Sequence, residues 1–379
     1  MEVPAPAARE AGFAPRSGDG DSAWSMSSFS SAADGLEISY KYRKGGGAKR
    51  QPPLVFIGGL SLQEVYETVF AVEGAPARDE YCLWMRAHSP TGWKYTRSLF
   101  DYDALDMARL INIAARESGS GKVTLVLHSY GTMLFQRMMQ LGYNGDVAAA
   151  IGHLSGTRVI LSNGVTHKNN VFVPQLWESY MMASNLDKFV LWLDGSDDYA
   201  EYWKHAAETN PAIAMPTNFN YAVWRVQRQN SIMAATKQGA DMSIADLSEP
   251  WDDPDIEPVR ASLLRTVRQN AVNPDWREAL LRRSYNTSHA NFDGNDMELL
   301  KNSGIRTVWV ATTKDQLLPW ASTKFLMQHL GMDAPKETPE AGSSFKNSEG
   351  TAEMRIFDGD HYFPLKHPRE FLKLIYSDK

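Results

Sequence analysis

The stretch Lys122-Val-Thr-Leu-Val-Leu-His-Ser-Tyr-Gly131-Thr-Met-Leu-Phe-Gln-Arg-Met-Met-Gln-Leu-Gly142 encodes a strand, a turn and a helix in succession. Its β-branched and apolar run, 123–127, is typical of a buried strand. Residues 132–141 place apolar side chains on one helical face, and Gly142 is suited to end that helix. Ser129 therefore lies at a sharp strand-to-helix turn, the geometry of a nucleophile elbow. At such a turn the helix N-terminus favours negative charge that develops beside the hydroxyl.

Strands and helices alternate on both sides of this stretch. Helices are expected near 62–72, 102–116 and 321–330, and from about 364 to 376, with a polar loop over 333–351. Apolar or alternating runs predict strands at 36–42, 53–57, 80–85, 159–162, 305–311 and 353–357. This alternation predicts an α/β fold with a mostly parallel central sheet and helices on both faces.

The alternation stops in the middle of the chain. Residues 166–299 contain six of the eleven tryptophans, many Met and Tyr residues, and mainly helical spacing. We expect this segment to form a helical cap inserted into a core made of residues 35–165 and 300–379. Residues 1–34 are rich in Ala, Ser, Gly and Pro, and we expect a disordered tail.

Composition limits the location and the partners of the protein. Its 379 residues are 43% hydrophobic and carry a net charge of −6, with no basic cluster of the kind that binds nucleic acid. No apolar run is long enough to cross a bilayer, and the tail lacks the apolar segment of a secretory signal. The single cysteine, Cys82, lies in an expected buried strand and fits a reducing compartment, so we expect a cytoplasmic protein. The oligomeric state stays open.

Two residues at other strand ends are candidates to assist Ser129. A serine hydroxyl needs an adjacent base, usually a histidine oriented by a carboxylate. His361 follows the expected strand 353–357, and Asp315 follows the strand before it. Each alone is an ordinary loop residue, but the carboxyl ends of parallel strands meet at one edge of a sheet, where ligands bind. The order Ser, Asp, His after three different strands therefore predicts a catalytic group.

These residues resemble the α/β-hydrolase fold family, whose members carry Gly-x-Ser-x-Gly at the elbow and a Ser…Asp/Glu…His triad. The resemblance rests on Leu127-His-Ser-Tyr-Gly131, on Asp315-Gln-Leu-Leu-Pro and on Gly359-Asp-His361. It implies that Gly58-Gly59-Leu60 takes the place of the usual His-Gly-x, so that the N–H groups of Leu60 and Tyr130 form the oxyanion hole. Two departures are Leu127, where the family has glycine, and Thr132, where a further glycine is frequent.

The resemblance implies hydrolysis of a carboxylic ester or lactone through an acyl-enzyme on Ser129, with Asp315 orienting His361. The aromatic cap indicates a fairly apolar small-molecule substrate. No metal or organic cofactor is expected. An acyltransferase or a C–C-bond hydrolase would use the same three residues, and a non-catalytic receptor for a hydrophobic ligand on the same fold is the alternative from another class.

Overall fold

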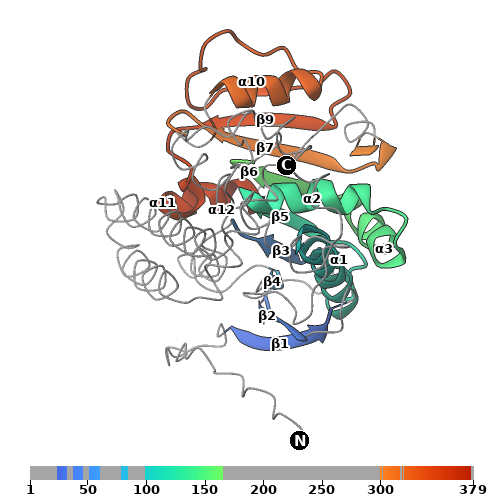
Figure 1. Ribbon diagram of the computed structural model, residues 1–379. Helices are drawn as coiled ribbons and strands as arrows, with labels where there is room; N and C mark the ends of the chain where they lie inside the picture. Colours follow the sequence, from blue (N-terminus) through green and yellow to red (C-terminus); the bar gives the residue numbers. More distant parts are fainter. Residues whose placement is uncertain are drawn as a thin grey trace, which may run out of the picture.

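The computed structural model describes residues 24–31, 37–45, 51–59, 78–83, 99–164, 299–300, 302–315, 318 and 320–376. The expected helical cap, the helix expected near 62–72 and most of the expected tail lie outside these residues. The described parts comprise the central sheet and the helices packed against it (Figure 1).

The sheet has nine strands in the order β1-β2-β4-β3-β5-β6-β7-β9-β8. Neighbouring strands pair in parallel from β4 to β9 across this order, whereas the pairs β1–β2, β2–β4 and β9–β8 are antiparallel. The mostly parallel sheet is thus confirmed. The strands are β1 (Ser25–Ser30), β2 (Glu37–Arg43), β3 (Leu54–Ile57), β4 (Glu80–Leu83), β5 (Thr124–His128), β6 (Arg158–Ser162), β7 (Arg306–Thr312), β8 (Ser344–Lys346) and β9 (Ala352–Phe357).

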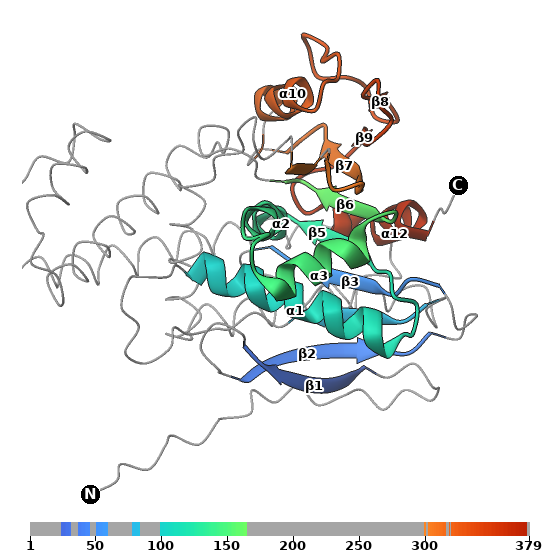
Figure 2. The ribbon, with the colours of Figure 1, turned by 90° about the vertical axis from the view of Figure 1, so that its right-hand side faces the viewer.

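Helices cover both faces of this sheet, as the alternation predicts. Figures 1 and 2 show α1, α2 and α3 on one side of the strands and α12 on the other. The described helices are α1 (Leu99–Glu117), α2 (Tyr130–Gln140), α3 (Gly145–Leu154), α10 (Trp320–His329), α11 (Phe363–Lys366) and α12 (Pro368–Tyr376). None of these helices combines the length and the hydrophobicity that crossing a bilayer requires.

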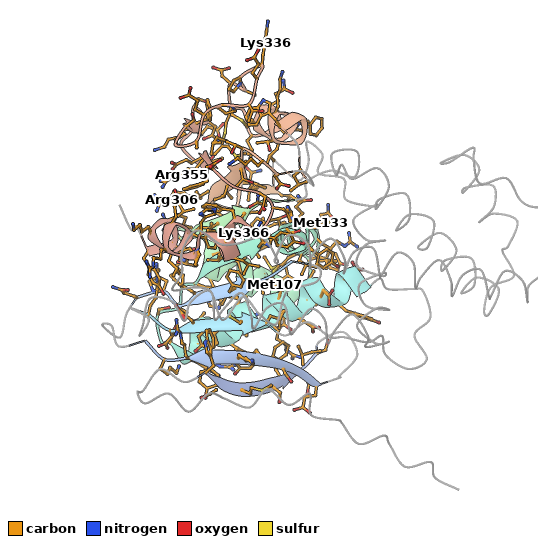
Figure 3. The ribbon with its side chains drawn as sticks, turned by 90° about the vertical axis from the view of Figure 1, so that its left-hand side faces the viewer. Met107, Met133, Arg306, Lys336, Arg355 and Lys366 are labelled. Carbon is orange, nitrogen blue, oxygen red and sulfur yellow. The ribbon has the colours of Figure 1, made fainter. Side chains whose placement is uncertain are left out.

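A hydrophobic core on each face of the sheet explains why the central strands are continuous apolar runs in the sequence. In β5, Leu125 and Leu127 pack in the core on the side of α1, which also contains Met107 and Met133 (Figure 3). Val126 faces the opposite way and packs in the core formed with α11 and α12. Because successive side chains of a strand point to opposite faces, a strand covered on both sides is apolar at every position.

One expectation about the N-terminal segment is wrong. Strand β1 lies inside the range 1–34 that we expected to be a disordered tail, and it pairs with β2 along its whole length. The serine-rich sequence of β1 lacks the apolar alternation that indicates a strand, because all six residues are at least partly exposed at the sheet edge. The stabilising contacts come from its partner: the ring of Phe29 lies 6.1 Å from that of Tyr40 on β2.

Smaller differences concern the C-terminal half and the region after α2. The last helix is broken into α11 and α12, because Pro368 disfavours helical geometry at His367, which has φ −125° and ψ 55°. Two further elements are absent from the expected ones: α3, and the short edge strand β8 within the expected polar loop.

Candidate active site

Ser129 occupies the turn between β5 and α2 in a backbone conformation that non-glycine residues avoid. Its φ is 50° and its ψ −115°, and among the described non-glycine residues only Asn163 also has a positive φ. The Ser129 N–H donates to the Ser162 carbonyl on β6 at 2.9 Å, which fixes the turn against the sheet. A strained backbone of this kind costs about 1–3 kcal/mol and is concentrated at functional sites. The elbow geometry expected of the quoted stretch is therefore present.

Close packing around the elbow explains its glycine. A Cβ on Gly131 would lie 2.8 Å from the Ile57 carbonyl oxygen, closer than real Cβ contacts, and 3.1 Å from that of Gly58. Leu127 replaces the other glycine of the motif, and its side chain is fully buried in the core on the side of α1. The bulk at Leu127 is thus taken up by the core.

Thr132, the second departure, is accommodated by a glycine far away in the sequence. A Cβ on Gly164 would lie 3.0 Å from both Oγ1 and Cγ2 of Thr132, so the missing side chain at Gly164 makes the room that Thr132 fills. The Thr132 hydroxyl also donates to the Ser129 carbonyl at 2.7 Å. The threonine therefore adds a hydrogen bond to the turn.

The fold brings together the side chains of Ser129, Asp315 and His361. Nε2 of His361 lies 2.9 Å from Oγ of Ser129, and Nδ1 lies 3.0 Å from Oδ2 of Asp315. The three residues follow β5, β7 and β9, and each is less than 9% exposed. A carboxylate only accepts hydrogen bonds, so Nδ1 carries the proton and Nε2 is free to accept the one from the serine. This arrangement is able to deprotonate the hydroxyl.

Asp315 is held as a carboxylate by groups besides His361. Its Oδ2 accepts from Nδ2 of Asn163 at 2.8 Å, and its Oδ1 accepts from the Leu318 N–H at 2.9 Å. Burial by itself raises the pKa of the Asp315 carboxyl. The charge of His361 and the hydrogen bonds from His361, Asn163 and Leu318 outweigh burial, so the pKa lies below its usual range. An ionised Asp315 can stabilise a protonated His361.

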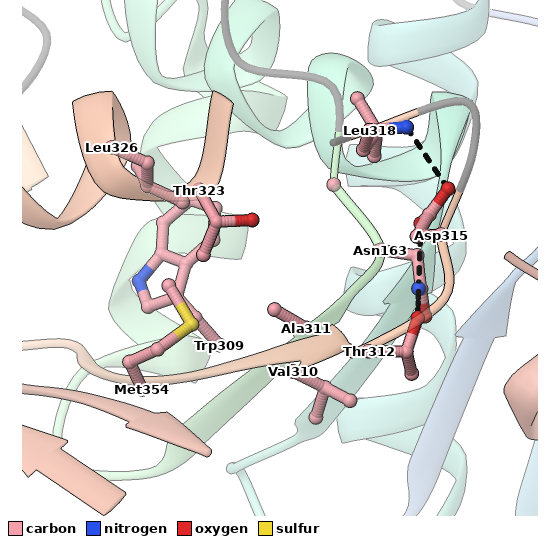
Figure 4. Close-up of a pocket in the computed structure, with 11 residues that line it drawn as sticks. Asn163, Trp309, Val310, Ala311, Thr312, Asp315, Leu318, Thr323, Leu326 and Met354 are labelled. Atoms are coloured by element: carbon pink, nitrogen blue, oxygen red, sulfur yellow. Dashed lines mark hydrogen bonds between the residues drawn. The ribbon is translucent and has the colours of Figure 1, made fainter. Parts of the chain in front are cut away.

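Asn163 contacts the acid directly, although the sequence did not indicate it as a site residue. Figure 4 shows Asn163 between Asp315 and Thr312, with its Nδ2 donating to both. Its Oδ1 accepts from the Ser162 hydroxyl at 2.8 Å, which fixes which end of the amide faces Asp315. The sequence feature that could have pointed to Asn163 is the Asn-Gly pair directly after a strand. Asparagine tolerates the left-handed backbone better than most residues, and Asn163 has a φ of 48°.

The hydrogen bonds of Asn163 continue to the loop that carries the histidine. Thr312, at the end of β7, donates to the carbonyl of Asp360 at 3.0 Å. Asp360 directly precedes His361, so the ends of β6, β7 and β9 are connected through side chains. The relative positions of acid and base are fixed by this network as well as by the sheet.

The expected oxyanion hole is described in part. Leu60 lies outside the described residues. The preceding residue, Gly59, passes directly beside the serine: a Cβ there would lie 3.2 Å from Cβ and 3.7 Å from Oγ of Ser129. Tyr130 is the first residue of α2, where N–H groups have no acceptor within the helix and the helix dipole favours an anion.

A small cavity lies behind the acid. It is lined by Asn163, Asp315, Trp309 and Thr323, among others (Figure 4), and its volume of about 20 Å³ suits one water molecule and not a substrate. Among the described residues, no group of three or more His, Cys, Asp or Glu side chains is placed to hold a metal ion.

Comparisons with known proteins agree with this architecture at the level of the fold. No protein-family model matches the sequence, and neither does any curated protein. A malate-bound esterase from Thermogutta terrifontis matches with a TM-score of 0.52 and 11% identity, over 93% of this chain and 96% of that one. The 2-hydroxy-6-oxo-6-phenylhexa-2,4-dienoate hydrolase from Rhodococcus sp. strain RHA1 matches with a TM-score of 0.52 and 12% identity, over 93% and 97%. These likenesses show a shared fold.

Proposed function

Because the chain has the α/β-hydrolase fold, we propose that it is a serine hydrolase that cleaves a carboxylic ester or lactone of a fairly apolar small molecule. The observation that carries the proposal is the unbroken chain of hydrogen bonds from Ser129 Oγ through His361 to Asp315, at a strained strand-to-helix turn. The names of the two proteins with this fold, an esterase and a dienoate hydrolase, are consistent with hydrolysis.

In the first half of the reaction, Ser129 Oγ attacks the ester carbonyl carbon while Nε2 of His361 takes the hydroxyl proton. Asp315 holds the imidazole and stabilises its positive charge. The N–H groups of Tyr130 and Leu60 are proposed to bind the oxyanion. When the tetrahedral intermediate collapses, the C–O bond to the alcohol breaks and His361 gives its proton to the leaving oxygen. An acyl ester on Ser129 remains.

In the second half, water replaces the alcohol. His361 takes a proton from the water as its oxygen attacks the acyl carbon, and a second tetrahedral intermediate forms. This intermediate collapses with cleavage of the bond to Ser129 Oγ, which recovers its proton from His361. The products are a carboxylic acid and the free enzyme. A lactone gives one ring-opened hydroxy acid by the same steps.

The apolar substrate and the cytoplasmic location are further parts of the proposal. Residues 166–299, proposed to form a helical cap over the site, supply the aromatic residues that suit an acyl chain or a ring. The one cysteine, Cys82, is buried in β4, as expected of a structural residue in a reducing compartment.

The central test is labelling with a fluorophosphonate probe, which reacts with activated serines. Wild-type protein should be labelled, and Ser129→Ala should not. As a matched control, Thr157→Val also removes a buried hydroxyl, but at the opposite end of the sheet, and should be labelled normally. An unlabelled wild type would contradict the proposal, and labelling that persists in Ser129→Ala would show a different nucleophile.

A panel of nitrophenyl esters with increasing acyl length then tests the reaction. Turnover that rises with chain length supports an apolar pocket. Labelling without ester turnover would favour lactones, acyl transfer or C–C-bond hydrolysis, and tight binding of apolar ligands without labelling would favour a receptor.

A further inference from the structure

We propose that His128, the residue before the nucleophile, is a positioning residue: a hydrogen bond from its imidazole to the main chain of His361 sets the distance between the base and Ser129. The proposal rests on the proposed serine chemistry. It gives the buried His128 side chain a role beyond packing.

The pleat of β5 places the ring where it meets the histidine loop. His128 ends β5, two residues after Val126, so both side chains point to the face covered by α11 and α12. Its side chain is almost completely buried, with 1% of the residue exposed. His361 lies between the end of β9 and the start of α11, and α11 packs on this same face. The two imidazole centroids are 5.1 Å apart.

The contact has a defined donor and acceptor. Nε2 of His128 lies 2.8 Å from the carbonyl oxygen of His361. A carbonyl oxygen only accepts hydrogen bonds, so Nε2 must carry the proton. In a neutral imidazole the other nitrogen, Nδ1, then has a lone pair. The tautomer of His128 is therefore determined by the carbonyl group of His361.

The other edge of the ring lies close to Gly59, in the loop after β3. A Cβ on Gly59 would lie 3.3 Å from Nδ1 of His128, so the backbone of the proposed oxyanion loop runs against this nitrogen. The ring thus lies between the main chain of the base and the loop beside the nucleophile. One rigid side chain separates the two segments whose spacing the reaction depends on.

The charge state of His128 suits this role. Burial, together with the nearby charge of His361, lowers the pKa of His128 to about 3, although the hydrogen bond to His361 and the charge of Asp315 act in the opposite direction. The ring is therefore neutral when His361 becomes protonated during turnover. A permanent cation at this distance would oppose that protonation, whereas a neutral donor leaves it undisturbed.

The test compares two substitutions of similar shape, His128→Gln and His128→Met. The glutamine amide nitrogen reaches about as far from the backbone as Nε2 and can donate to the His361 carbonyl, whereas methionine cannot donate. Val126→Ala is the control, because it removes buried volume from the same face of β5 but cannot affect a hydrogen bond, since neither side chain has a donor. The readouts are the labelling rate of Ser129 with the fluorophosphonate probe, kcat and KM for an ester that is turned over, and the thermal unfolding midpoint.

We expect His128→Met to lower the labelling rate and kcat about fivefold with KM nearly unchanged, since one hydrogen bond is worth about 1 kcal/mol, which corresponds to a factor of about five in rate. His128→Gln should recover most of the rate. Val126→Ala should lower the unfolding midpoint and leave the labelling rate of the folded protein close to that of wild type. This combination separates positioning from a loss of stability.

Two results would overturn the inference: labelling of His128→Met at the wild-type rate, or an equally slow His128→Gln. If His128→Met does not fold, His128→Asn replaces it, because the shorter amide reaches the position of Nδ1 and not that of Nε2. An unlabelled wild type would instead refute the serine chemistry itself, so the two failures are distinguishable.

Discussion

The buried, neutral His128 makes the stability of the protein depend on pH in a way that can be measured. Its pKa is about 3 in the folded protein and about 6.5 in an unfolded chain. Between these values the unfolded state binds one more proton than the folded state. The contribution of His128 to stability is therefore complete above pH 6.5 and is lost as the pH falls towards 3.

The size of the effect follows from these two values. A group that is protonated in the unfolded state but not in the folded state changes the free energy of unfolding by up to about 1.4 kcal/mol per pH unit. Integrated from pH 7 to pH 5, the loss attributable to His128 is about 2 kcal/mol. That is a large part of the total stability of a typical domain, about 5–15 kcal/mol.

The assay is urea denaturation at pH 7, 6 and 5, followed by far-UV circular dichroism, for wild type and His128→Gln. Other titrating groups are common to both proteins, so the difference between the two pH dependences isolates residue 128. Wild type should lose about 2 kcal/mol more than the variant between pH 7 and pH 5. Parallel pH dependences would refute the reasoning, because they would mean that His128 binds a proton as readily in the folded protein as in the unfolded chain.

Three further substitutions test the packing and the hydrogen bonds of the site. Asn163→Gly keeps the left-handed backbone but removes the hydrogen bond to Asp315, which is worth about 1.5–3 kcal/mol. The kcat for ester hydrolysis should therefore fall about ten- to a hundredfold, and an unchanged kcat would contradict a role for this amide. Gly164→Ala should lower the free energy of unfolding by about 1–3 kcal/mol, because the new methyl group clashes with Thr132. Adding Thr132→Ala should restore much of this stability. If urea titrations show that the stability losses of the two substitutions simply add, the contact would be contradicted. Ser129→Gly should be more stable than Ser129→Ala by about 1 kcal/mol in thermal unfolding, reversing the usual order, because glycine accepts φ 50° without strain.

Much of the core could be predicted because its signals are local. The apolar runs of β3, β5, β6 and β7 indicate strands that are buried on both faces. A strand followed by a helix indicates that the next strand runs parallel to it. Since parallel strands end at one edge of the sheet, Asp315 and His361 could be placed near Ser129 from chain order alone. Strand β1 was missed because its stabilisation comes from pairing with β2 and not from its own composition.

The supporting contacts of the site could not be predicted, because each joins residues that are distant in the chain. Asn163 is 152 residues from Asp315, and the room for Thr132 comes from Gly164. Neither residue carries a pattern that names its partner. The departures at Leu127 and Thr132 are explained only by their surroundings in the folded protein, the core on the side of α1 and Gly164.

The sequence by itself determined the strand, the sharp turn and the helix around Ser129, and the order in which Asp315 and His361 follow it. Hydrophobic periodicity and turn residues encode those features within a few residues of each position. Only the tertiary structure decided that the three side chains form a chain of hydrogen bonds, and that His128 donates to the main chain of His361, 233 residues away. Hydrogen bonds depend on distances of a few tenths of an ångström, and those are set by strand order, register and packing across the whole sheet.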